Sequence, residues 1–110
     1  MTMPLVSVVM PAYGHERFVG QAIESVLAQT LKNWELIVID DDSKDGTWRE
    51  VQRFQDPRIV SGRHQFNRGA AATLNEGVAC AQGRYIAILN SDDVYHDNRL
   101  ERLVGYLERN

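Results

Sequence analysis

The sequence predicts an α/β fold in which a mostly parallel β-sheet carries helices on both faces. Two observations support this prediction. Four short apolar runs alternate with four segments whose apolar residues recur at helical spacing. The connections between them are short, and such alternation is typical of parallel strands joined by right-handed crossover helices. We therefore expect a single domain, residues 1–110, made of four β-α units.

The first unit begins with Val6–Met10, a run whose β-branched residues predict a strand. Pro11 is expected to end this strand, because proline cannot donate a hydrogen bond to a central ladder. A helix is predicted over His15–Thr30 from one stripe of apolar residues at helical spacing. The stripe consists of Val19, Ala22, Ile23, Val26 and Leu27.

The next two units are shorter. Leu36–Ile39 is a continuous apolar run and predicts a strand buried on both faces. A helix is predicted from Asp45 to about Phe54. Asp56 and Pro57 then form a turn, because proline fixes φ and restricts the residue before it. Ile59–Val60 follows as a short third strand.

The last unit contains the strongest helix signal. Ala70–Ala81 is rich in alanine, the best helix former, and Gly83 is placed to end this helix. Tyr85–Leu89 predicts the fourth strand, and Arg99–Arg109 predicts a closing amphipathic helix. The expected core face of the alanine-rich helix consists of Ala71, Leu74, Val78 and Ala81.

Composition excludes several classes of protein. The net charge of −3, from 12 basic and 15 acidic residues, gives no basic field for nucleic acid, so no nucleic-acid partner is expected. No apolar run approaches the roughly 20 residues of a membrane span. The single cysteine, Cys80, excludes an internal disulfide and indicates a reducing, cytoplasmic location. It is interpreted as a small core residue.

Acidic residues gather after two of the predicted strands. Asp40, Asp41 and Asp42 follow the second strand, and Asp92 and Asp93 follow the fourth. Crowded carboxylates repel one another unless a cation or donor groups offset the charge. Ligands of open α/β sheets bind at the carboxyl ends of the strands, so we expect both groups to converge there.

Tyr13, which follows the first strand, is expected at the same edge. An aromatic ring can stack on a nucleotide base, and a carboxylate can accept a hydrogen bond from a base or a ribose. Another carboxylate can hold Mg²⁺ or Mn²⁺ together with diphosphate oxygens, and arginine can pair with phosphate. The pattern therefore predicts a nucleoside diphosphate and a divalent metal as ligands.

Simpler interpretations remain open for single residues. Tyr13 could equally pack at a strand end, and Arg68 could equally be a surface charge. Asp45 and Asp97 are favoured as residues at helix starts. Two further pairs of residues are interpreted without a ligand: His15 and His64 lack a Cys or His partner at metal-ligand spacing, so no zinc site is expected, and Trp34 and Trp48 are expected to pack.

Other functional motifs are absent from the chain. There is no GxxxxGK[ST] loop, no GxGxxG after the first strand and no GxSxG elbow, which argues against NTPases, dinucleotide-binding dehydrogenases and serine hydrolases. A receiver domain needs an acid pair after its first strand, where this chain has PAYG. A nucleotidyltransferase needs a glycine-rich phosphate loop there.

Several segments together resemble the N-terminal half of family 2 glycosyltransferases with the Rossmann-like GT-A fold. They are VSVVMPAYGHERFVGQAIESVLAQTLKNWELIVIDDDSKDGT, NRGAAATLNEG, GRYIAILNSDDVY and DNRLERL, and they cover nearly all of the chain. The resemblance implies an inverting hexosyltransferase of polysaccharide biosynthesis. It would use a nucleotide-diphosphate sugar, usually UDP-linked, with Mg²⁺ or Mn²⁺, and a glycan, lipid or protein acceptor.

The resemblance also implies roles for particular residues. Asp41 matches the acid that hydrogen-bonds the base, with Asp40 beside it, and Asp92 matches the metal ligand. The segment that cradles the base matches Pro11, Ala12 and Tyr13; the ribose and diphosphate contacts match Ser91 and Asp93; the basic loop contact matches Arg68.

Two positions depart from the family pattern. Asp42 stands where the family has glycine, and Asn90 stands where the first acid of the DxD motif often lies. The catalytic residues stay unknown, because the family's general base is expected beyond residue 110. A four-stranded sheet without its continuation would expose an edge, so we expect self-association. The alternative function is a non-catalytic nucleotide-binding module. Attachment to the inner face of a membrane through further segments is left open.

Overall fold

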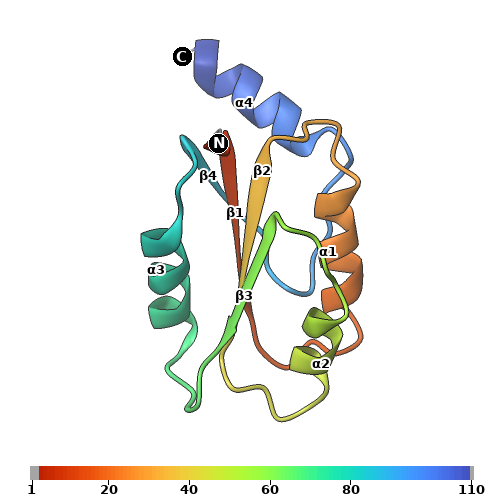
Figure 1. Cartoon of the computed structure of the whole chain (residues 1–110), viewed down its shortest axis with the longest axis vertical. Helices are drawn as coiled ribbons and strands as arrows, with labels where there is room; N and C mark the ends of the chain where they lie inside the picture. Colours follow the sequence, from red (N-terminus) through yellow and green to blue (C-terminus); the bar gives the residue numbers. More distant parts are fainter. Residues whose placement is uncertain (1–2, 110) are drawn as a thin grey trace.

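The computed structural model describes residues 3–109. Strands and helices alternate along the chain as predicted (Figure 1). The elements are β1 (Val6–Ala12), α1 (Val19–Leu27), β2 (Trp34–Asp40), α2 (Thr47–Gln52), β3 (Ile59–Arg63), α3 (Ala70–Cys80), β4 (Tyr85–Ile88) and α4 (Arg99–Arg109).

The four strands form one parallel sheet in the order β3-β2-β1-β4. Val8 of β1 is paired with Leu36 on one side and with Ala87 on the other. The chain adds strands outward from β1 to β3 and then crosses to place β4 on the opposite side of β1. This reversal of direction creates a crevice at the carboxyl ends of β1 and β4, which is where open α/β sheets bind ligands.

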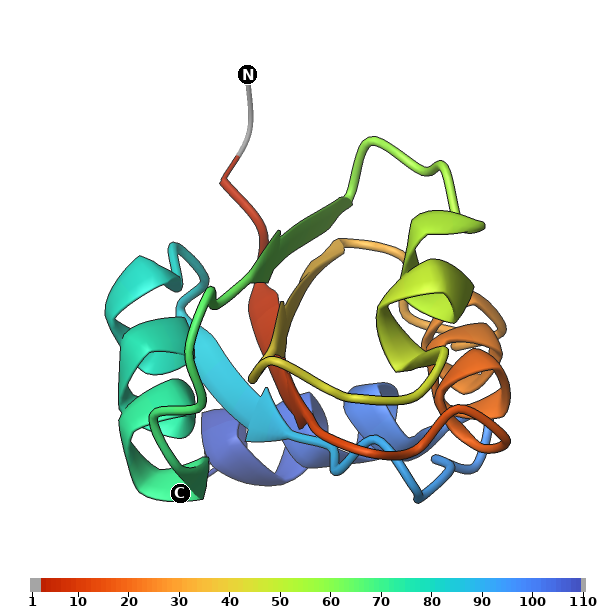
Figure 2. The ribbon, with the colours of Figure 1, turned by 90° about the horizontal axis from the view of Figure 1, so that it is seen from below.

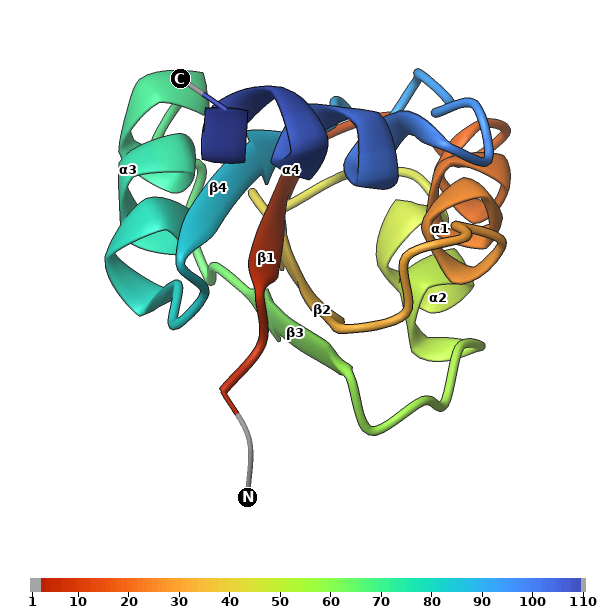
Figure 3. The same cartoon turned by 90° about the horizontal axis from the view of Figure 1, so that it is seen from above.

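Helices cover both faces of the sheet, as expected. Helices α1 and α2 lie on one side and α3 lies on the other (Figures 1 and 3). The main core lies between the sheet and α1, α2 and α4. Its buried members include Val8, Met10, Ile23, Leu36 and Leu100. Trp34 is also buried and Trp48 packs against this core, so the interpretation of both as packing residues is confirmed.

The opposite face is thinner, because α3 alone packs on it. The residues that α3 buries are Thr73 and Gly77, so the predicted core stripe of this helix was wrong. Gly77 approaches β1 so closely that a methyl group in its place would collide with the Val9 side chain. Glycine at this position lets the helix backbone reach the sheet, and that contact sets which helix face is buried.

Two expectations about the first β-α unit are corrected. Strand β1 continues through Pro11 to Ala12. The Val9 carbonyl accepts a hydrogen bond from the Leu89 amide on the β4 side, and the Ala12 carbonyl accepts one from the Asp41 amide on the β2 side. Because backbone groups alternate between the two sides along a strand, the nitrogen of Pro11 lies on the β4 side. The pairing of β1 with β4 ends before this position, at Val9. Proline therefore removes no ladder hydrogen bond there. Helix α1 is shorter than predicted.

Cys80 is exposed, not a core residue. It lies at the last turn of α3 and lines an open groove beside β3, where no further element of residues 3–109 covers the sheet. Gly83 was predicted to end α3, but the structure explains it by close packing against β1. Its φ is not left-handed, and a methyl group there would lie 2.6 Å from the backbone nitrogen of Ser7.

A buried glutamine fixes the start of α4. The side chain of Gln29 accepts a hydrogen bond from the Leu100 amide at 2.9 Å and donates one to the His96 carbonyl at 2.6 Å. It thereby satisfies backbone groups that a helix terminus leaves unpaired. Within residues 3–109, no helix has the length and apolar character needed to cross a membrane.

Candidate functional site

The loops after β1, β2 and β4 come together at the carboxyl edge of the sheet, which Figure 2 shows from below. They surround a cleft of about 410 Å³. The cleft is lined by Pro11, Ala12, Tyr13, His15, Asp41, Asn67, Gly69, Ala70, Thr73, Asn90, Ser91 and Asp92. The expected convergence of Tyr13 with the two acidic loops is therefore present in the fold.

Hydrogen bonds fix the loop after β1 to the loop after β2. The Gly14 amide donates to the Ser43 hydroxyl at 3.0 Å, and the His15 amide donates to the Thr47 hydroxyl at 2.9 Å. Asp45 accepts a hydrogen bond from the Thr47 amide at the start of α2, so its predicted role at a helix start is confirmed. The left-handed φ of +66° at Gly14 makes the turn that leaves Tyr13 half exposed beside the cleft.

The side chain of His15 joins the loop after β4 to this framework. The His15 Nδ1 atom lies 2.7 Å from the Ser91 hydroxyl, and Ser91 is buried. On the other side of the ring, Nε2 lies 3.7 Å from the Asp92 carboxylate. His15 thus links residues from the first and last loops of the cleft.

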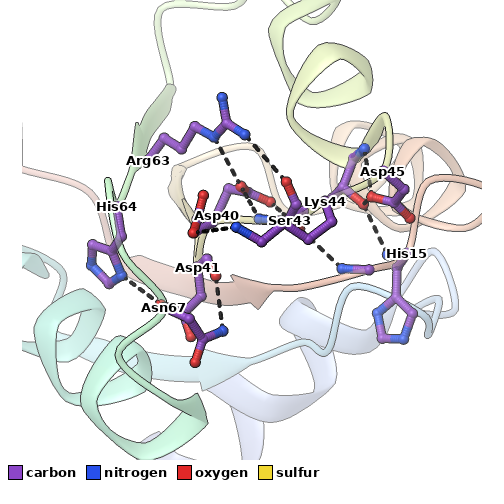
Figure 4. A network of polar contacts seen from close by, with 12 residues as sticks. His15, Asp40, Asp41, Ser43, Lys44, Asp45, Arg63, His64 and Asn67 are labelled. Carbon is purple, nitrogen blue, oxygen red and sulfur yellow. Dashed lines mark hydrogen bonds and ion pairs between the residues drawn. The ribbon is translucent and has the colours of Figure 1, made fainter.

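Asp40 is completely buried and serves the loop itself. Its carboxylate accepts hydrogen bonds from both the amide and the hydroxyl of Ser43, at 3.0 and 2.6 Å. The Arg63 guanidinium lies 3.5 Å from the same carboxylate and donates to the Ser43 carbonyl (Figure 4). Asp40 therefore shapes the acidic loop and does not line the cleft.

Asp42 adopts a left-handed conformation, with a φ of +60°. This conformation is costly for residues with a Cβ, although aspartate tolerates it better than most. Its carboxylate is paired with the Lys44 ammonium at 2.9 Å. The backbone conformation thus gives a physical reason for the glycine that the resemblance places at this position.

Asp41 is buried and most of its hydrogen-bonding capacity is already used. Its Oδ1 atom lies 2.8 Å from both the His64 Nδ1 atom and the Arg68 amide nitrogen. Its Oδ2 atom accepts a hydrogen bond from the Gly69 amide at 2.9 Å. A carboxylate offers about four acceptor positions, so about one remains for a ligand in the cleft.

The same contacts set the charge of Asp41. Burial by itself raises the pKa of the carboxyl group, but the hydrogen bonds from His64, Arg68 and Gly69 outweigh it and lower the pKa below its ordinary value. Asp41 is therefore an anion at neutral pH. Figure 4 shows His64 and Asn67 beside it, and the Asn67 amide donates to its backbone carbonyl at 3.1 Å.

The structure brings together six of the nine residues expected in the site. Pro11, Ala12, Tyr13, Asp41, Ser91 and Asp92 all line the cleft. Asp40, Arg68 and Asp93 do not line it. The Arg68 side chain lies toward Glu76, with 3.7 Å between their charged groups, although its backbone amide contacts Asp41. Asp93 is exposed and accepts a hydrogen bond from the Val94 amide.

Sequence reasoning missed His15, Asn67 and His64. His15 lies directly after PAYG, so its position next to a predicted site loop was a usable signal. His64 and Asn67 lie in the loop after β3. Asn67 opens the segment NRGAAATLNEG, which belongs to the family resemblance, so its place there was a usable signal; His64 precedes that segment and had no such signal. Their roles depend on how this loop folds back over Asp41, which the sequence pattern does not specify.

The donor set of the cleft fits a divalent cation held jointly with a ligand. Asp92 presents an exposed carboxylate, and Asn90 lines the same cleft with a neutral amide. Among the described residues, no group of three or more His, Cys, Asp or Glu side chains could enclose a metal ion. Oxygen donors in small number suit Mg²⁺ or Mn²⁺, which retain water and take further ligands from phosphate groups.

Comparisons with known proteins agree with this geometry. The family model described as "Glycosyl transferase family 2" matches residues 7–110. The Escherichia coli protein named UDP-Glc:alpha-D-GlcNAc-diphosphoundecaprenol beta-1,3-glucosyltransferase WfgD is 43% identical over 106 residues. This match covers 96% of the chain and 42% of WfgD, so the chain spans less than half the length of that relative.

Two solved structures share the fold. S. aureus TarS (residues 1–349), in complex with UDP-GlcNAc, has a TM-score of 0.88 at 22% identity, over 94% of this chain and 31% of TarS. The mannosyltransferase PcManGT from Pyrobaculum calidifontis, in complex with GDP-Man and Mn²⁺, has a TM-score of 0.76 at 25% identity. That match covers 86% of this chain and 29% of PcManGT. The expected α/β class with a GT-A-like sheet is thereby confirmed.

Proposed function

This chain belongs to glycosyl transferase family 2, and on that premise we propose that it binds the sugar donor of a glycosyltransferase. The donor is a nucleoside diphosphate sugar, and the whole enzyme transfers its sugar to an acceptor hydroxyl with inversion at the anomeric carbon. One observation carries the proposal: Tyr13, Asp41 and Asp92, from three different loops, line a single cleft.

Each of these residues has a role that its chemistry fits. The half-exposed ring of Tyr13 offers a face on which a base stacks. The buried carboxylate of Asp41 would accept a hydrogen bond from the base. The exposed carboxylate of Asp92 would hold a divalent cation, which would offset the negative charge of the diphosphate. Pro11 and Ala12 line the same cleft and would lie beside the base, and Ser91, which His15 contacts, would lie near the diphosphate.

The remaining capacity of Asp41 favours uridine as the nucleoside. His64 and the Arg68 amide already contact Oδ1, and the Gly69 amide contacts Oδ2. Uracil presents a single ring N–H on its pairing edge, which one acceptor position satisfies. Guanine presents two adjacent donors, which need both carboxylate oxygens. We therefore propose a UDP-sugar as the donor.

A divalent cation, Mg²⁺ or Mn²⁺, would be held by Asp92 together with the diphosphate. When bound, it neutralises the charge that develops on the leaving diphosphate. Asn90 adds no charge at its position, so Asp92 supplies the main anionic contact from this chain. His15 orients Ser91 and lies beside Asp92, which keeps the loop after β4 in place.

We also propose that these 110 residues self-associate. Ile86 and Ile88 lie on the edge strand β4 with 42% and 47% of their surface exposed. An open strand edge with exposed apolar side chains pairs readily with a second copy. Sedimentation at high concentration tests this point, and a clean monomer would contradict it.

The experiment for donor binding is a thermal-shift comparison of UDP, UDP-glucose, UDP-GlcNAc, GDP and GDP-mannose, each with Mn²⁺, with Mg²⁺ and with EDTA. A ligand at 100 times its Kd stabilises the folded state by about 2.7 kcal/mol. We expect uridine nucleotides with metal to raise Tm most. No shift with any nucleotide would refute the proposal, and a larger shift with guanosine nucleotides would refute the assignment of the base.

A further inference from the structure

His64 is a buried histidine placed between two carboxylates. It follows β3, and only 7% of its surface is exposed. Its Nδ1 atom lies 2.8 Å from Asp41 Oδ1, and its Nε2 atom lies 2.6 Å from Glu76 Oε2 on α3. Its backbone amide donates to the Asp40 carbonyl at 2.9 Å, which holds the residue against the end of β2. The ring therefore bridges the acidic loop and α3.

This geometry favours one protonation state of the ring. A neutral imidazole has one N–H donor and one lone-pair acceptor. Both of its neighbours are carboxylate oxygens, which accept hydrogen bonds and do not donate them when ionised. Only the doubly protonated imidazolium donates to Asp41 and Glu76 at the same time. A neutral ring would direct a lone pair at one of the two anions.

The surrounding charges favour the imidazolium as well. The loop after β2 contributes Asp41, and α3 contributes Glu76. The positive charge of Arg68, in the loop after β3, disfavours the imidazolium in part. The Arg68 guanidinium lies 3.7 Å from the Glu76 carboxylate. Arg63 on β3 is directed to Asp40. The hydrogen bonds to Asp41 and then to Glu76 raise the pKa of His64 above its ordinary value of 6.5, against the effect of burial.

We propose that His64, as an imidazolium bridging Asp41 and Glu76, is a positioning residue that orients the Asp41 carboxylate toward the donor nucleotide. This inference rests on the proposed function. The His64 proton occupies one acceptor position on Oδ1, so that the free position of the carboxylate faces the cleft. Through Glu76 the same ring fixes α3, whose N-terminal residues Ala70 and Thr73 line the cleft.

The bridge makes the affinity for the donor nucleotide depend on pH. The pKa of His64 is raised in the folded protein, so the bridge is fully formed below pH 6.5 and is lost as the pH rises through the folded value. Above the pKa of His64 in the folded protein, the ring is neutral and the Asp41 carboxylate loses its charged hydrogen-bond partner. The carboxylate can then adopt a second orientation. Donor affinity should therefore fall as the solution becomes more alkaline.

The first measurement is the protonation of His64 in the unliganded chain. Long-range ¹H–¹⁵N spectra distinguish an imidazolium from either neutral tautomer, and the chain has three histidines to assign. We expect both ring nitrogens of His64 to carry protons at pH 6.5 and to lose one at higher pH. A neutral ring at pH 6.5 would overturn the proposal.

The second measurement is the affinity for UDP by calorimetry between pH 6 and pH 9, with metal present. For the wild type we expect a fall on the order of tenfold across the His64 titration. His64→Gln should bind more weakly at pH 6.5 and show no such fall. Glu76→Gln should move the fall to lower pH, because one of the two anions is removed. His96→Gln, at an exposed histidine, should match the wild type.

The outcomes separate this inference from the function on which it rests. Equal pH profiles for wild type and His64→Gln would refute the positioning role. If His64→Gln does not fold, Glu76→Gln tests the positioning role, because Glu76 is partly exposed and does not line the cleft. A decrease of UDP affinity at the same pH as in the wild type would then refute it. If the wild type binds no nucleotide at any pH, the proposed function and the positioning role both fail. The spectra would still report whether the bridge exists.

Discussion

The His15 ring and the Ser91 hydroxyl lie 2.7 Å apart, although 76 residues separate them in the chain. This contact joins the loop after β1 to the loop after β4 across the switch point of the sheet. It positions two loops that line the cleft, so its loss should affect ligand binding more than folding.

Ser91→Ala tests this contact. Removing one hydrogen-bonding partner at a buried site costs about 1–3 kcal/mol, and we expect UDP affinity to fall by a corresponding amount. Calorimetry measures the affinity, and the far-UV spectrum checks the fold. Ser61→Ala, at an exposed serine on β3, is the matched control. Unchanged affinity in Ser91→Ala would show that the contact does not support the donor site.

Asp41→Asn should destabilise the protein at neutral pH by about 1–3 kcal/mol, because the carboxylate accepts hydrogen bonds from His64 and two backbone amides. The pKa of Asp41 is lowered in the folded state. Its stabilising contribution is therefore present above pH 3.8 and is lost as the pH falls through the folded value. Urea unfolding of both proteins should show their difference in stability shrinking toward pH 2. A difference that is constant with pH would contradict this account.

Asp92→Asn should remove the metal dependence of donor binding, because Asp92 supplies the main anionic contact to the cation. The measurement is UDP affinity with Mn²⁺ and with EDTA. In the variant we expect both affinities to be alike and low. Asp97→Asn, which changes an exposed aspartate of the same loop outside the cleft, should keep the response to Mn²⁺. A full metal response in Asp92→Asn would assign the cation to other residues.

Gly77→Ala and Gly105→Ala should have opposite effects on stability. A methyl group at Gly77 collides with Val9, so α3 must move from the sheet at a cost of about 1–3 kcal/mol. Gly105 lies in α4 with no atom near the site of the added methyl group, so alanine should stabilise by about 0.5–1 kcal/mol. Chemical unfolding at pH 7 measures both. Equal effects of the two substitutions would argue against the close packing of α3.

Asp42→Ala should be less stable than Asp42→Gly by about 1 kcal/mol, because the φ of +60° disfavours a Cβ atom. Both variants lose the ion pair with Lys44, so their comparison isolates the backbone effect. Thermal unfolding of the two variants gives the difference. If alanine is as stable as glycine, the loop has another conformation in solution.

Much of the fold follows from local patterns. The order of elements, the parallel sheet and the edge at which the acidic loops meet were all predicted, because each depends on short-range periodicity and on the handedness of crossovers. Tyr13, Asp41 and Asp92 were placed together for the same reason. The resemblance to a known family added roles for these residues that periodicity alone does not supply.

Long-range packing decided the rest. The buried face of α3 follows from the contact of Gly77 with Val9, which no helical periodicity indicates. The three adjacent aspartates have different surroundings and different roles, because each contacts different residues. Asp40 is buried under Ser43 and Arg63, Asp41 is held by His64 and two amides, and Asp42 turns outward to Lys44. The sequence by itself determined that carboxylates would gather at this edge. Only the tertiary structure decided which of them has an acceptor position left for a ligand, because hydrogen-bond partners come from segments distant in the chain.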